Sequence, residues 1–148
     1  MNITDLIGYH LRRAEAVTKS DYAKVTFDLN ISPAQFSALV VIAKNPGLMQ
    51  SDLADALGID RSAVVHLIDA LEAQHLVIRE KIKTNRRKYL LYITDEGIKI
   101  RNDIKRRLDD SNEIRLKNLT LDEREQLMHL LKMIYSNSNS TDPKQHRS

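Results

Sequence analysis

The sequence predicts a mainly α-helical protein that carries one small β-hairpin. Three observations lead to this fold class. Aromatic residues make up only 5% of the 148 residues and there are four glycines, unlike a β-sandwich, while 42% of the residues are apolar, enough for a buried core. Apolar residues recur at helical spacing along most of the chain. A single stretch, residues 76–93, instead places β-branched and aromatic runs on either side of a charged turn.

The first predicted helix covers residues 2 to about 28 and would be roughly 40 Å long at 1.5 Å per residue. That length exceeds what the core of a small domain requires, so we expect part of its apolar face to contact another subunit. Its stripe, at spacings of three to five, consists of Ile3, Leu6, Ile7, His10, Leu11, Ala14, Val17 and Tyr22.

The second helix has clear start and stop signals. Ser32 can cap it, Pro33 suits the first helical position, and Gln35 completes a capping box. The turn-forming residues 45–47, Asn-Pro-Gly, end it. Its apolar positions, which predict a central place in the core, are Phe36, Leu39, Val40, Ile42 and Ala43.

Two short helices follow. The first runs from Gln50 to Gly58, which ends it, and the second runs from Arg61 to about Gln74 with Asp60 as its N-cap. Two helices of this length joined by a short Gly-containing turn are typical of a helix-turn-helix, in which the second helix enters the major groove of DNA. The predicted inward faces are Leu53, Ala54 and Leu57 on the first, and Val64, Leu67, Ile68 and Leu71 on the second.

Residues 76–82 and 88–93 predict the strands of a hairpin whose tip is formed by residues 83–87. From Arg79 to Lys88 there are six basic residues and one acidic residue, a net charge of +5, whereas the whole chain carries +3. A basic hairpin beside a recognition helix suits a DNA duplex, because neutralising phosphates is the main sequence-independent source of DNA affinity. The middle of the chain is therefore predicted to be a winged helix-turn-helix lobe.

Two further helices are expected after the hairpin. Residues 94–97 begin the first, with acidic residues where the helix dipole favours them, and Thr120 with Glu123 forms a capping box that begins the second. The first should bury Ile98, Ile104 and Leu108 and expose the basic residues Lys99, Arg101, Lys105, Arg106 and Arg107, and the second should align Leu127, Leu130, Leu131 and Ile134.

The order of these elements predicts four parts. They are a dimerisation helix at 1–30, the winged helix-turn-helix lobe at 31–95, C-terminal dimerisation helices at 96–135, and a disordered tail at 136–148, which has no apolar residue. The terminal helices have more apolar face than one small core uses, so we assign them to a two-fold dimer interface. Two recognition helices about 34 Å apart would meet successive major grooves, which predicts a pseudo-palindromic DNA site.

The same residues resemble the MarR family of bacterial winged-helix regulators over residues 3–135. The resemblance implies that Arg87 enters the minor groove, oriented by residue 85, where the family usually has Asp and this chain has Asn. It also implies that Ser51 takes over part of the phosphate contact of a Thr that the family often has at the position of Met49. The residues that carry the resemblance are Leu53-Ala54, Leu57-Gly58, the pattern through Leu71-Glu72, Asn85-Arg86-Arg87, Leu91, Ile93-Thr94 and Gly97.

The exposed side of the recognition helix and the wing supply the candidate DNA contacts. Arg61 can pair bidentately with guanine, and Ser62 and His66 can bind bases or phosphates. The alternative is a solvated helix face and a hairpin tip that is charged for solubility; adjacent cations repel one another there, which favours a polyanion partner. The full predicted set is Ser51, Arg61, Ser62, Ala63, Val65, His66, Asn85, Arg86, Arg87 and Lys88.

The resemblance further implies a small phenolic or aromatic carboxylate ligand, bound between the dimer helices and the DNA-binding lobe. The candidate residues are His10 and Arg13 with nearby Tyr9, which can bind an anion, and Phe36, which can supply a hydrophobic wall. In the alternative interpretation, His10 is an interface residue with its hydrogen bonds satisfied and Arg13 forms a surface or intersubunit salt bridge.

Other functional classes find little support. The absence of cysteine removes disulfides, thiolate metal sites and thiol-based redox sensing. Glu72 and His75 have the spacing found in di-iron bundles, but no second such pair exists, so we expect no metal, no cofactor and no enzymatic activity. There is no signal peptide and the longest apolar run, residues 38–43, is too short to span a bilayer, which predicts a cytoplasmic protein.

We therefore expect a homodimeric regulator that binds double-stranded DNA sequence-specifically, as a repressor released by a small aromatic or phenolic ligand. The alternative is a winged-helix module that binds another protein without ligand control, because fold alone does not determine function. Exposed apolar residues at the wing would favour that alternative, and none lies between Lys83 and Lys88.

Overall fold

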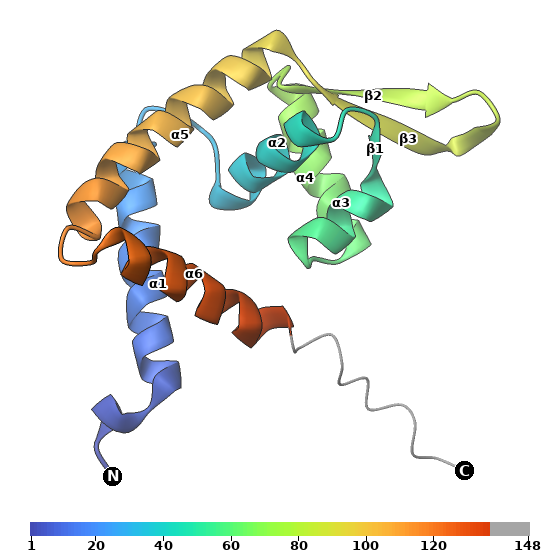
Figure 1. Ribbon diagram of the computed structural model, residues 1–148. Coiled ribbons are helices and arrows are strands. Elements are labelled where there is room, and N and C mark those ends of the chain that lie inside the picture. Colours follow the sequence, from blue (N-terminus) through green and yellow to red (C-terminus); the bar gives the residue numbers. More distant parts are fainter. Residues whose placement is uncertain (137–148) are drawn as a thin grey trace, which may run out of the picture. The chain divides into compact units, whose positions relative to one another are not determined.

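The computed structural model describes residues 1–136, except for the side chains of Arg86 and Arg87, and residues 137–148 of the predicted tail lie outside the described residues. The chain divides into two compact units, Met1–Asp109 and Asp110–Ser148. The predicted fold class, mainly α with a small β wing, is confirmed (Figure 1). The elements are a 3₁₀ turn (Ile3–Asp5), α1 (Ile7–Val25), α2 (Pro33–Lys44), β1 (Leu48–Met49), α3 (Gln50–Leu57), α4 (Arg61–Ala73), β2 (Val77–Ile82), β3 (Asn85–Ile93), α5 (Asp95–Arg115) and α6 (Leu121–Ser136).

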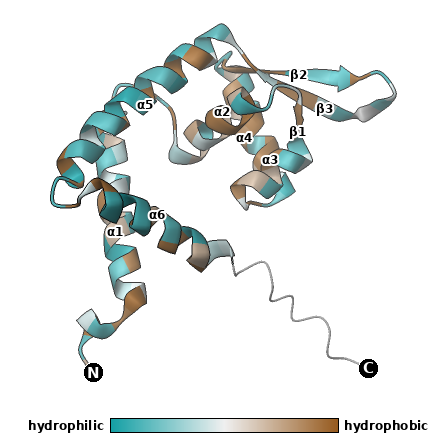
Figure 2. Ribbon diagram, viewed as in Figure 1, coloured by the Kyte–Doolittle hydropathy of each residue, from teal (hydrophilic) through white to brown (hydrophobic). Residues whose placement is uncertain are grey.

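The core of the first unit lies where α2, α3, α4 and the sheet pack together. The predicted inward faces of α3 and α4 are confirmed, and Leu57 and Leu67 pack at the edge of the core. Figure 2 shows apolar residues concentrated on α2 and α4. Val40, predicted to be central, is exposed because it lies one residue beyond Leu39 and so points about 100° away. The fully buried large side chains are Leu39, Ile42, Leu53, Val64, Ile68, Leu71, Val77, Leu91 and Ile104.

Three antiparallel strands form the sheet, in the order β1-β3-β2. The hairpin is confirmed, but its turn is shorter than predicted: β3 begins at Asn85, so only Lys83 and Thr84 lie between the strands. The sequence does not predict β1, because two residues carry no periodic pattern. Met49 pairs with Leu90, which places the start of α3 beside the wing.

The hairpin has a register shift near its tip. Lys81 lies opposite Tyr89 and Ile82 lies opposite Asn85, so residues 86–88 of β3 fall within the irregularity. A bulge of this kind bends a strand and increases its local twist. The wing residues predicted to contact DNA therefore belong to an irregular strand rather than to a loop.

Helix ends follow the predicted capping signals in most places. Ser32 Oγ accepts from the amide of Gln35 at 3.2 Å, while the Ser32 amide donates to Gln35 Oε1 at 2.7 Å. Gly58 ends α3 in the left-handed conformation, with φ of +63°. Asp60 occupies the N-cap position of α4, but its side chain makes no capping hydrogen bond, so that part of the prediction is wrong.

The first helix is shorter than predicted. A separate 3₁₀ turn precedes α1, because Asn2 and Asp5 form a local capping box. Leu6 is extended, with φ of −95° and ψ of 116°, and the continuous helix begins only at Ile7 and ends at Val25. The hydroxyl of Tyr22 donates to the carbonyl of Ile31 at 3.1 Å, and burial raises the pKa of Tyr22 to about 12.

The start of α5 is packed directly against the segment that joins α4 to β2. Gly97 is buried, and a Cβ atom at this position would lie 2.3 Å from the carbonyl oxygen of Leu76. Ile98, predicted to be buried, is exposed, and Ile100 packs against the core instead. The reason is that Gly97, rather than Ile98, shares the inward face of the helix with Ile104.

Arg107 is a structural residue rather than part of a free basic surface. Its guanidinium binds both carboxylate oxygens of Asp28, at 2.5 and 3.0 Å, and donates to the carbonyl of Val25 at 2.9 Å. Asp103 lies 2.9 Å from it on the same helix. The hydrogen bond from Arg107 lowers the pKa of Asp28, and hydrogen bonds from Arg106 and then Arg107 lower the pKa of Asp103. The same two carboxylates raise the pKa of Arg107. Arg107 thereby ties α5 to the segment that follows α1.

The second unit contains α6, which begins with the predicted capping box of Thr120 and Glu123. Arg124 binds Glu113 at 2.7 Å and the carbonyl of Leu116 at 3.0 Å. No residue of α6 is buried, although apolar residues occur along it (Figure 2). Its exposed large apolar residues are Leu121, Leu127, Met128, Leu130, Leu131, Met133, Ile134 and Tyr135.

None of the helices in the described residues combines the length and the apolar character that crossing a membrane requires.

Candidate nucleic-acid interface

The outward face of α4 carries the predicted recognition residues. Val64, Ile68 and Leu71 turn inward at helical spacing, so the opposite face of the helix is directed away from the core. The exposed residues on the N-terminal half of this face are Arg61, Ser62, Ala63, Val65 and His66. Helix-turn-helix proteins read base edges with the N-terminal residues of this helix.

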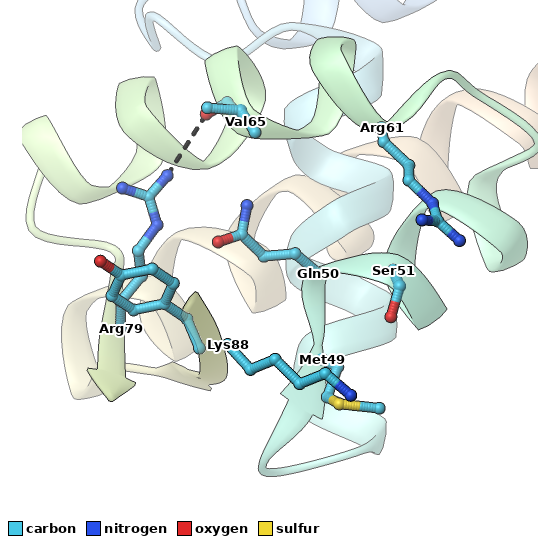
Figure 3. Close-up of a pocket in the computed structure, with 8 residues that line it drawn as sticks. Met49, Gln50, Ser51, Arg61, Val65, Arg79 and Lys88 are labelled. Atoms are coloured by element: carbon cyan, nitrogen blue, oxygen red, sulfur yellow. Dashed lines mark hydrogen bonds between the residues drawn. The ribbon is translucent and has the colours of Figure 1, made fainter. Parts of the chain in front are cut away.

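A cleft of about 640 Å³ lies between the start of α3, the outward face of α4 and the wing. Four predicted DNA-contact residues line it: Ser51, Arg61, Val65 and Lys88 (Figure 3). Residues far apart in sequence are thus gathered on one surface. The predicted residues Ser62, Ala63 and His66 lie on the same helix but do not line the cleft.

The cleft also contains four residues outside the predicted DNA-contact set: Met49, Gln50, Arg79 and Tyr89. Gln50 is the first residue of α3, and the amides at that end of a helix lack intrahelical partners. The sequence therefore contains a signal for Gln50, because it begins a predicted helix. Met49 and Tyr89 come into place only because β1 pairs with β3, which no local pattern indicates.

The cations of this surface differ in their partners. The ion pairs among the described residues leave Arg61 and Lys88 free, while Arg79 is bound to two carboxylates. The sequence-based sum of +5 for the wing therefore overstates its available charge, because Asp69 and Glu72 neutralise Arg79. Free cations around a cleft are the groups that release counterions when they meet phosphates.

At the wing itself the structure covers only part of the prediction. Asn85 begins β3 and lies opposite Ile82, and Lys88 is exposed. The side chains of Arg86 and Arg87 lie outside the described residues. Their contribution to the interface therefore stays a prediction.

The four predicted ligand residues fall into two groups. Tyr9 and His10 pack edge to face at 5.3 Å, and the guanidinium of Arg13 lies 5.9 Å from the Tyr9 ring. Phe36 instead packs on Tyr22, with 6.3 Å between ring centroids. Tyr22 is thirteen residues after Tyr9 in the same helix, roughly 20 Å away, so one chain alone does not unite the four residues.

The residues considered for a di-iron site have structural roles. Glu72 binds Arg79, and His75 follows α4 in the left-handed conformation, with φ of +59°. The carbonyl of His75 accepts from the hydroxyl of Thr94 at 2.7 Å. Among the described residues, no three His, Cys, Asp or Glu side chains are grouped in a way that could hold a metal ion.

Comparisons with known proteins agree with this geometry. A MarR family model matches residues 29–88. The putative transcriptional regulatory protein for the hcr operon of Thauera aromatica is 34% identical over 136 residues, covering 91% of this chain and 82% of that protein. Among solved structures, the transcriptional repressor CouR bound to a 23-mer DNA duplex is 33% identical, with a TM-score of 0.84 and coverage of 90% and 94%. CouR from Rhodococcus jostii RHA1 bound to p-coumaroyl-CoA is 27% identical, with a TM-score of 0.81 and the same coverage.

Proposed function

The chain belongs to the MarR family of transcriptional regulators, and we propose that it is a homodimeric repressor that binds a pseudo-palindromic operator and is released by an aromatic ligand. Family membership confirms the prediction that the chain is a DNA-binding regulator and not an enzyme. The dimer, the operator symmetry, the sign of regulation and the ligand are the proposed parts.

One observation supports the assignment of the DNA-binding surface. Ser51 of α3, Arg61 of α4 and Lys88 of the wing line a single cleft, although they are far apart in sequence. We assign Arg61 and Lys88 to the duplex because they are cations without carboxylate partners among the described residues. Ser62, Ala63, Val65 and His66 would face the major groove, and Asn85, Arg86 and Arg87 would reach the minor groove from the wing.

The proposal of a dimer is supported by two helices, α1 and α6, that bury little apolar surface within one chain. Neither α1 nor α6 contains a buried residue, and both expose large apolar side chains. Exposed apolar faces of this extent mark interaction surfaces. We assign residues 1–30 and 96–135 to the two-fold interface and residues 31–95 to the DNA-binding lobe.

For the ligand we propose an aromatic acid or its coenzyme A thioester. The support is the p-coumaroyl-CoA in the solved CouR structure and the aromatic and cationic group of Tyr9, His10 and Arg13. Within one chain Phe36 lies apart from Tyr9, His10 and Arg13. Phe36 would therefore line the pocket together with residues from the partner subunit. The ligand needs only to bind more tightly to a dimer whose lobe spacing does not fit DNA; such coupling is typically ~1–3 kcal/mol.

The test is fluorescence-anisotropy titration of the purified protein with its own upstream intergenic DNA and with scrambled DNA, at several salt concentrations. We expect tighter binding to the upstream DNA and weaker binding as salt increases. Lys88→Ala and Arg87→Ala should each lower the slope of log affinity against log salt by about one phosphate equivalent. Lys44→Ala, which removes an exposed cation of α2 that does not line the cleft, is the matched control and should leave the slope unchanged.

The outcomes separate the parts of the proposal. Equal affinity for both DNAs at every salt concentration would contradict sequence-specific regulation and favour a protein partner for the wing. Specific binding that no aromatic acid or thioester weakens would leave the repressor intact and overturn the ligand. A ligand that acts through the proposed coupling should raise the dissociation constant of the complex by roughly 5- to 150-fold.

A further inference from the structure

Arg79 lies at the base of the wing, but its side chain turns back toward the recognition helix. The side chain is only 17% exposed, although a basic residue on the edge strand β2 would ordinarily extend into solvent. Figure 3 shows its guanidinium directed at the backbone of α4 beside Val65. A residue with this sequence context is readily counted as a DNA-binding cation, and the structure gives it another role.

Three acceptors of α4 hold the guanidinium. Asp69 Oδ1 lies 2.5 Å from one terminal nitrogen and Glu72 Oε2 lies 3.1 Å from the other, while the carbonyl of Val65 accepts at 3.3 Å. These three residues are spaced four and three apart, so they form one stripe along the helix. A planar guanidinium binds such a stripe with fixed geometry, which a lysine ammonium group does not provide.

The wing side of Arg79 is held as well. Its guanidinium carbon lies 5.9 Å from the centre of the Tyr89 ring on β3, and its backbone lies opposite Leu91. Tyr89 directly follows Lys88, and Val65 lies one helical turn after Arg61. The Arg79 bridge therefore connects the two segments that carry the free cations of the cleft.

We infer that Arg79 is a positioning residue for DNA recognition: it does not bind the duplex but holds the wing at a fixed spacing from the recognition helix. This inference rests on the proposed function. A wing that moves relative to α4 would meet phosphates in several registers, so loss of the bridge should weaken binding to the operator more than binding to unrelated DNA.

The carboxylates provide the sharpest test. Neutralising Asp69 and Glu72 removes two negative charges near the interface, which by electrostatics alone would raise affinity for any DNA. If Arg79 positions the wing, the same substitutions should instead lower the affinity for the operator. We expect the double variant Asp69→Asn/Glu72→Gln to bind the operator about 10-fold more weakly than the wild type, with affinity for scrambled DNA unchanged or higher.

Arg79→Gln should lose operator affinity to a similar extent with an unchanged salt slope, because no phosphate contact disappears. Arg79→Lys should restore little of that affinity. Adding Arg79→Gln to the carboxylate variant should cause little further loss, because both act through one bridge. Stoichiometric titration of the active fraction separates a fold defect from lower affinity of folded protein. The matched control is Lys44→Ala, an exposed cation of the same lobe outside the cleft.

Three results would overturn the inference. A salt slope lowered by about one in Arg79→Gln would make Arg79 a phosphate contact. Unchanged operator affinity in that variant, or tighter operator binding by the carboxylate variant, would remove the positioning role. A wild-type protein that does not distinguish the operator would contradict the proposed function itself, and amide hydrogen exchange of β2 and β3 in the free variants would then decide separately whether the bridge holds the wing.

Discussion

The DNA-binding lobe buries many of its large apolar residues, whereas the last helix exposes them. In the lobe, α2, α3, α4 and the sheet enclose side chains such as Leu39, Ile68 and Leu91 completely. Each such side chain contributes about 1.5–3 kcal/mol of hydrophobic stabilisation. The last helix, α6, has a comparable supply of large apolar residues and buries none of them within the chain. The difference indicates that the lobe can fold on its own contacts, whereas α6 requires a second surface.

The largest effect should come from overfilling the contact between the start of α5 and the lobe. We expect Gly97→Ala to lower the free energy of unfolding by about 2–3 kcal/mol, because the new methyl group would meet the carbonyl oxygen of Leu76 at 2.3 Å. Urea denaturation at a fixed protein concentration measures the change. Gly8→Ala is the control, since its Cβ would meet only the flexible end of Arg12 at 3.4 Å. Similar destabilisation by both substitutions would show that the start of α5 is less tightly packed than the structure indicates.

The next largest effect tests α6. We expect Leu130→Asp to weaken self-association by roughly 2 kcal/mol, about 30-fold in the dimer dissociation constant, because it places a charge in an apolar interface. Sedimentation equilibrium measures the association. Lys132→Asp puts the same side chain about 200° around the helix and should have little effect. If the two variants dissociate equally, or neither does, the apolar face of α6 is not the dimer surface.

A smaller effect should come from the end of the recognition helix. His75 has a φ of +59°, which L-residues with a Cβ adopt at a cost of about 1 kcal/mol. His75→Gly should therefore stabilise the lobe by up to about 1 kcal/mol in urea denaturation. Gly58→Ala, at a φ of +63°, should destabilise it by a similar amount. A loss of stability in His75→Gly would mean that its side chain makes a contact that outweighs the backbone strain.

The smallest effect concerns the exposed ion pair that ties α5 to the segment after α1. The hydrogen bond from Arg107 lowers the pKa of Asp28 below its ordinary value of 3.8 in the folded protein. Its contribution to stability is therefore complete above pH 3.8 and is lost as the pH falls through the lowered pKa.

Thermal unfolding of the wild type and of Asp28→Asn between pH 2.5 and 6 checks this prediction. The stability difference should be constant near pH 6 and should shrink toward pH 2.5. Asp55→Asn, at an exposed aspartate of α3 without an ion pair in the described part of the chain, serves as the control. A difference that does not depend on pH would show that Asp28 acts through its shape alone.

The candidate site was predictable wherever it depends on a single helix. Arg61, Val65 and Ser51 follow from the two helical periods of residues 50–73, because an inward face determines an outward one. The joint cleft was not predictable, since it depends on the pairing of β1 with β3. The charge sum of the wing, which counted Arg79 as an available cation, is too high for a similar reason: the carboxylate partners of Arg79 are seven and ten residues away, on another element.

The sequence by itself determined the features whose causes are local. Capping boxes at Ser32 and Thr120, the turn at Gly58 and the inward stripes of α3 and α4 arise from interactions within one helical turn, so a short stretch of residues contains all the partners. Only the tertiary structure decided that Arg107 binds Asp28, 79 residues away. Charge patterns show that a residue needs a partner but not which one, because that choice depends on the distances that folding creates.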